Sequence, residues 1–79
     1  MEKQVDLRGI YFTEAVAAKA ETVLKEQDYG KVSFILSSGE CASCVAMEAF
    51  RRGWEMKLDY RDECYTLMLY KEMEKENCA

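Results

Sequence analysis

The chain has 79 residues, 49% of them hydrophobic, which is enough for one folded domain with a single small core. This length excludes a large multi-step enzyme and a separate cofactor domain. The net charge is −4 and the basic residues are scattered, which argues against nucleic acid as the primary partner.

The sequence contains no histidine, so it lacks the commonest general base and metal ligand. Any chemistry therefore falls to cysteine, carboxylate, lysine or tyrosine side chains. No apolar run is long enough to span a membrane, and the residues after Met1 do not resemble a secretory leader. We therefore expect a cytoplasmic protein without membrane contact, whose four cysteines are mostly free thiols.

The first half of the chain predicts a strand, a helix and a second strand. A short apolar run at residues 5–7 ends just before Gly9, which favours a turn. Residues 13–28 place apolar side chains at helical spacing, with Thr13 as the expected N-cap. Residues 31–37 are rich in β-branched and aromatic types and predict a strand.

The second half predicts a helix and a hairpin. Turn and cap residues at 37–40 precede a helix whose apolar stripe runs from Ala42 to Phe50. Residues 54–61 alternate apolar and charged side chains, which predicts a strand with one buried face. After a turn, residues 64–71 form a largely apolar strand that we place inside the sheet.

The predicted order is β-α-β-α-β-β, and both helices must cover the same sheet if the chain has one core. The fold class is therefore α/β, a two-layer sandwich with a four-stranded mixed sheet and two helices on one face. Residues 1–72 form the domain and residues 73–79 a charged flexible tail. On the uncovered face, Ile35 with Met68 or Tyr70 is expected to form an apolar patch consistent with a homodimer.

The string Asp6-Leu7-Arg8-Gly9, followed by two residues and a helix start, resembles the opening of the TusA/SirA-like sulfur-carrier family, which reads D-L-R-G-x-x-C-P-x-P. That family has the same order of elements and a glycine closing the second helix, as Gly53 does here. The resemblance implies a sulfurtransferase that relays a persulfide between protein partners. We predict no cofactor and no metal site.

The sequence departs from the family where its chemistry lies, because Phe12 takes the place of the sulfur-bearing cysteine. In the family that cysteine sits at a helix N-terminus, where free N–H groups and the helix dipole favour a thiolate. Tyr11, Phe12 and Thr13 are therefore predicted as binding residues. Tyr11 and Phe12 either form a knob that docks on a partner, or Phe12 fills the space of the missing thiol.

Cys41 and Cys44 are the candidate catalytic residues. Their i, i+3 spacing at the predicted start of the second helix brings their β-carbons to about 5–6 Å, close to disulfide geometry. A helix N-terminus lowers thiol pKa values, but Glu40 and Glu48 lie close by and oppose the thiolate. The alternative is that both cysteines simply pack as small apolar residues.

Three interpretations remain open. The pair carries sulfur as a persulfide, the chain is a non-catalytic interaction module, or two chains together hold a metal or cluster. A metal cage within one chain would also need Cys64 and Cys78, which we interpret as a packing residue and an incidental exposed thiol.

Overall fold

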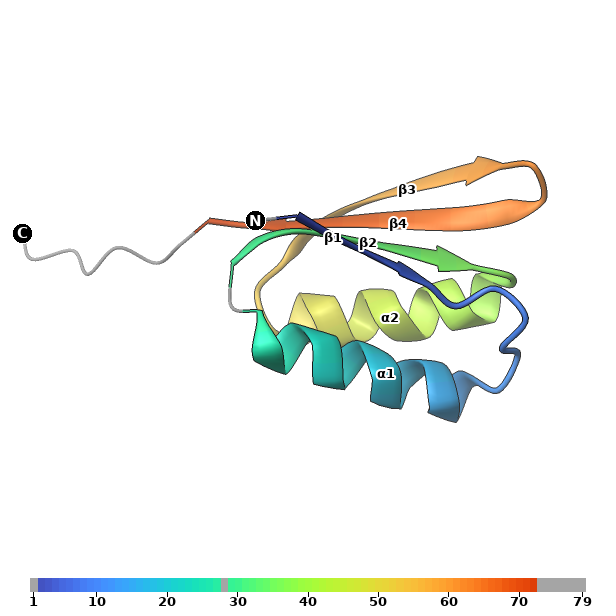
Figure 1. Cartoon of the computed structure of the whole chain (residues 1–79), viewed down its shortest axis with the longest axis horizontal. Coiled ribbons are helices and arrows are strands. Elements are labelled where there is room, and N and C mark those ends of the chain that lie inside the picture. The colour runs from blue at the N-terminus through green and yellow to red at the C-terminus, as the bar shows by residue number, and fades with distance from the viewer. Residues whose placement is uncertain (1, 28, 73–79) are drawn as a thin grey trace, which may run out of the picture.

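The computed structural model describes residues 2–27 and 29–72 (Figure 1). The predicted tail at residues 73–79, with Cys78, lies outside the described residues. The elements follow the predicted order: β1 (Glu2–Asp6), α1 (Thr13–Glu26), β2 (Gly30–Leu36), α2 (Gly39–Arg51), β3 (Glu55–Arg61) and β4 (Cys64–Lys71).

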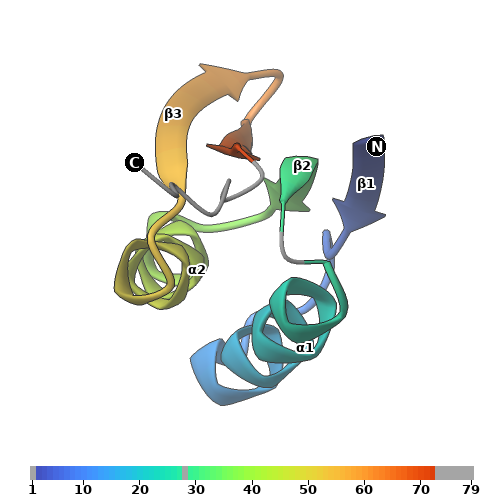
Figure 2. The same ribbon diagram turned by 90° about the vertical axis from the view of Figure 1, so that its left-hand side faces the viewer.

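The four strands form one sheet in the order β1-β2-β4-β3. β1 and β2 are parallel, and β4 runs antiparallel to both of its neighbours, so β4 is internal as predicted. Both helices lie on one face, and Figure 2 shows α1 beneath the β1 side and α2 beneath the β3 side. The predicted two-layer α/β sandwich is confirmed.

The core fills the space between the sheet and the helix pair. The apolar stripe predicted for α1 is the buried one, and fully buried side chains come from both central strands and both helices. The largest of them are Phe34, Leu36, Leu67, Leu69, Val16, Val32 and Val45.

Two predicted buried surfaces are wrong in part. On β3, Leu58 and Tyr60 are 54% and 57% exposed, because β3 is an edge strand and α2 leaves its outer half uncovered. On α2, Phe50 is 77% exposed while Cys41 is fully buried, so the helix presents a slightly different stripe to the core. Small side chains on that stripe allow the helix to lie close to the sheet and to α1.

The two helices begin differently. Ser38 caps α2 as predicted, because its side chain accepts a hydrogen bond from the backbone N–H of Cys41 at 3.2 Å. The N-cap of α1 is Phe12 rather than the predicted Thr13, and no side chain accepts a hydrogen bond there. Thr13 is the first residue of the helix.

Candidate functional site at the start of the two helices

The β1–α1 loop meets the start of α2 at one end of the sheet. Because β1 and β2 are parallel and each leads into a helix, both helices begin at this end (Figure 1). The backbone N–H of Leu7 donates to the Ile35 carbonyl at 2.8 Å, and that of Gly9 donates to Ser37 Oγ at 2.9 Å. The loop is therefore fixed against the β2–α2 junction.

The Asp6-Leu7-Arg8-Gly9 string builds this loop. The Asp6 carboxylate accepts hydrogen bonds from the Arg8 guanidinium at 2.6 Å and from the Arg8 backbone N–H at 3.0 Å. These bonds lower the pKa of Asp6 from 3.8 to about 2. Leu7 is buried in the core, and Gly9 has a φ of +92°, a backbone conformation that favours glycine. The string thus has a structural role in this chain.

The loop presents two aromatic side chains to solvent. Phe12 is 79% exposed and its neighbour Tyr11 is also largely exposed. Phe12 therefore does not fill the space of a missing thiol, which removes one of the two predicted interpretations. Thr13, next in sequence, is half-buried.

Cys41 lies inside the core, with no exposed surface. Its thiol donates to the Ile10 carbonyl at 3.5 Å, which ties α2 to the β1–α1 loop, and its own backbone N–H is occupied by Ser38. The thiol is thus neither reachable by a visiting protein nor beside a free amide. For Cys41 the burial agrees with the packing alternative, because this residue belongs to the stripe of α2 that packs inward.

Cys44 lies one turn further into α2 and is half-buried. Its sulfur is therefore the more accessible of the pair. The unpaired N–H groups and most of the dipole effect belong to the first turn of a helix, and Cys44 lies beyond that turn. Cys41, Cys44 and Cys64 are all free thiols.

No pattern in the sequence predicts that Cys64 approaches Arg8. Cys64 begins β4 and is half-buried, and it lies near the Arg8 guanidinium, whose pKa is raised mainly by Asp6 and only secondarily by Cys64. Only the sheet order, with β4 next to β2, brings the two together. Across residues 2–27 and 29–72, no three cysteine or carboxylate side chains cluster in a way that could hold a metal ion.

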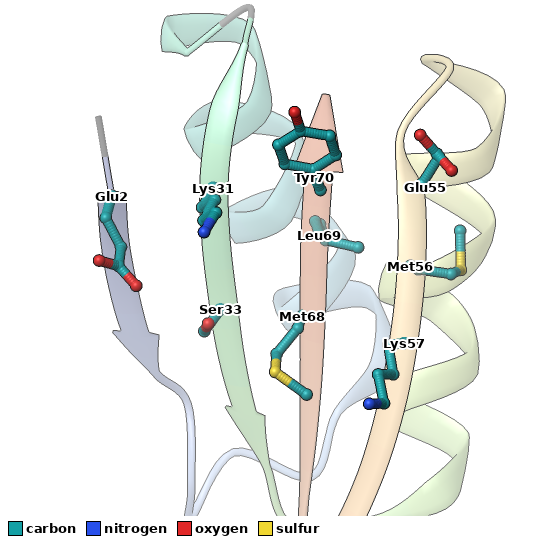
Figure 3. Close-up of a pocket in the computed structure, with 9 residues that line it drawn as sticks. All are labelled: Glu2, Lys31, Ser33, Glu55, Met56, Lys57, Met68, Leu69 and Tyr70. Carbon is teal, nitrogen blue, oxygen red and sulfur yellow. The ribbon is translucent and has the colours of Figure 1, made fainter. Parts of the chain in front are cut away.

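The uncovered sheet face carries a shallow hollow around Met68 and Tyr70 (Figure 3). Charged side chains flank these two residues, among them Lys31 and Lys57, and Ile35 pairs with Thr66. The predicted apolar patch is therefore interrupted by polar groups. Neither helix in the described part of the chain is long and apolar enough to cross a membrane.

Among solved structures, the chain is similar to a SirA-like protein from Desulfitobacterium hafniense, with a TM-score of 0.77 and 14% sequence identity. The match covers 86% of this chain and 95% of that one. No known family profile and no curated protein matches the sequence. The comparison shows that the chain has the SirA-like fold, as the motif and the order of elements predicted.

Proposed function

We propose that this chain is a cytoplasmic, SirA-like protein-binding module that docks on a partner through Tyr11 and Phe12. The observation that supports this proposal is the exposure of Phe12 at the N-cap of α1. In sulfur carriers of this shape the same position presents the reactive cysteine, so the partner we favour is a protein that donates or accepts sulfur.

Phe12 contributes little to the fold where it lies. Serine, threonine, aspartate or asparagine at an N-cap stabilises a helix by about 0.5–2 kcal/mol relative to an apolar residue, and Phe12 offers no such bond. Its ring is too exposed for core burial to offset that loss. Large aromatic side chains are, however, the residues that most often anchor protein interfaces. Binding gives a reason for phenylalanine here that stability does not.

The loop is also suited to binding because it is preorganised. Hydrogen bonds at Leu7, Gly9 and Ile10 hold its backbone against β2 and α2. A partner therefore does not have to order the loop, and a preformed surface binds more tightly for the same contact area.

The test compares two variants that each remove one exposed aromatic ring. Phe12→Ser removes the docking residue, and Tyr29→Ser removes a ring between α1 and β2, away from both the docking loop and β3. Immobilised wild-type chain and both variants are used to recover partners from cell extract, with quantitative mass spectrometry. Proteins recovered by wild type and Tyr29→Ser, and lost with Phe12→Ser, support the proposal. Equal recovery by all three chains contradicts it.

A second candidate function is sulfur carriage at Cys44, favoured by the half-buried position of that thiol. The Cys44 thiolate would attack the outer sulfur of a donor persulfide, forming a Cys44 persulfide and releasing the donor as a thiolate. Incubation with a cysteine desulfurase and cysteine would then add the mass of one sulfur atom. Cys44→Ser should abolish the addition, whereas the matched variant Cys64→Ser should retain it.

A further inference from the structure

β3 is an edge strand of the sheet. It pairs with β4 over its whole length from Glu55 to Arg61, and no other strand within residues 2–27 and 29–72 pairs with its other edge (Figure 1). The chain contains no proline, and the β3–β4 register is continuous, without a bulge. Proline and bulges are two of the features that normally prevent an edge strand from pairing with another chain. This edge therefore remains open to a further strand.

The charges along β3 are complementary to themselves. On the uncovered sheet face, Glu55, Lys57, Asp59 and Arg61 alternate in sign. If two copies of β3 pair antiparallel about Leu58, Glu55 lies opposite Arg61 of the second copy and Lys57 lies opposite Asp59. Parallel pairing in register would instead oppose like charges, which is destabilising. The exposed Arg61–Asp59 ion pair at 3.1 Å contributes little stability, so it does not prevent re-pairing.

The same register pairs apolar residues on the helix-facing side. Leu58 meets Leu58 of the second copy, and Met56 meets Tyr60. Leu58 and Tyr60 are the apolar residues of β3 that the single chain leaves more than half exposed. Met56 and Leu58 also line a groove against α2. A second copy of β3 would cover the surface that α2 does not reach.

The outer flank of α2 is exposed on the same side of the molecule. A two-fold axis perpendicular to the sheet leaves the helices of both copies on one face. A helix is about as wide as two neighbouring strands, about 10 Å, so each helix covers roughly two strands of the sheet. In the four-helix layer of the dimer, the two α2 helices would therefore be neighbours. Met47 and Phe50, which are largely exposed and line a hollow with Met56, lie on that flank.

We propose that two copies of this chain pair their β3 strands antiparallel, centred on Leu58, to form one continuous sheet with the two α2 helices in contact. The dimer explains the alternating charges of β3, the exposure of Leu58 and Tyr60, and the apolar flank of α2 together. It does not depend on the docking loop, whose residues lie at the start of α1.

Sedimentation equilibrium of the full chain, in the presence of a reductant, tests the proposal. Wild type is expected to form a dimer. In a dimer of Lys57→Asp chains, each new aspartate lies opposite Asp59 of the other copy. In a dimer of Asp59→Lys chains, each new lysine lies opposite Lys57 of the other copy. Either change therefore creates two pairs of like charges per dimer. Each variant is expected to weaken association by at least about tenfold. Gln4→Lys, on the exposed strand β1 at the opposite edge of the sheet, is the control and should leave association unchanged.

Mixing the two charge variants tests the register. In a heterodimer of Lys57→Asp with Asp59→Lys, every pair at these positions is again opposite in charge, so dimer formation should recover. Recovery also shows that both variants are folded. A wild-type chain that stays monomeric at high concentration overturns the proposal, as does unchanged dimerisation of both variants or a mixture that fails to associate.

Discussion

The two ends of the helix pair differ in how they are held. At the C-terminal end of α2, Arg52 bonds Glu48 at 2.7 Å and approaches Glu21 of α1 at 3.7 Å, while Lys71 donates to the Arg52 carbonyl at 2.8 Å. At the other end, α1 begins at Thr13, its N-cap Phe12 makes no capping hydrogen bond, and the rings of Tyr11 and Phe12 are exposed. Polar pairing stabilises one end, whereas the other end keeps residues that stability does not require. That contrast is why we propose that the docking site lies at the N-terminal end of the helices.

The largest expected effect comes from the residue that anchors the docking loop. Leu7 is buried, and Leu7→Ala removes most of its apolar side chain from the core. We expect a loss of about 2–4 kcal/mol in the free energy of unfolding, measured by urea denaturation. A loss below about 1 kcal/mol would mean that the loop is not held through this side chain.

A smaller loss is expected at the paired end. Arg52→Ala leaves the mostly buried Glu48 carboxylate without its best partner and should cost about 1 kcal/mol in the same assay. Arg51, which is well exposed and lies 3.6 Å from Glu48, provides the matched control. Arg51→Ala should cost no more than a few tenths of a kcal/mol. Equal losses would show that Arg52 has no special role in joining the helices.

The smallest effect concerns the acid stability of the loop. The pKa of Asp6 is about 2 in the folded chain, below its ordinary value of 3.8, because Arg8 donates hydrogen bonds to the carboxylate. A lowered pKa contributes stability above the unfolded value, and that contribution is lost as the pH falls from about 4 to about 2. Asp6→Asn removes it. Urea denaturation at several pH values should therefore show that the free energy of unfolding falls less with decreasing pH for Asp6→Asn than for wild type. The same fall in both chains would contradict the assignment of the lowered pKa to Asp6.

Local patterns in the sequence were sufficient to predict the helices and strands and their order along the chain. The apolar stripe of α1 and the internal position of β4 both follow from periodicity and from the apolar character of residues 64–71. The loop motif was also informative, because Asp6 and Arg8 interact locally, two residues apart. These features depend on neighbours in the chain, and a sequence displays such neighbours directly.

The errors arose where packing between distant elements decides exposure. Alternation shows which side of β3 faces the helices, but not that α2 leaves Leu58 uncovered. The i, i+3 spacing places Cys41 and Cys44 on one side of α2, but a small rotation of the helix decides which thiol is buried. The contact between Cys64 and Arg8 likewise depends on the order of strands in the sheet.

The free energy of unfolding of Phe12→Ser is the most direct test of the claim that Phe12 is kept for binding. Serine at this N-cap can accept a hydrogen bond from the first turn of α1, and little apolar burial is lost. We predict that the variant unfolds at higher urea and is more stable than wild type by about 0.5–1 kcal/mol. A variant less stable than wild type would show that Phe12 serves the fold and is not kept for binding.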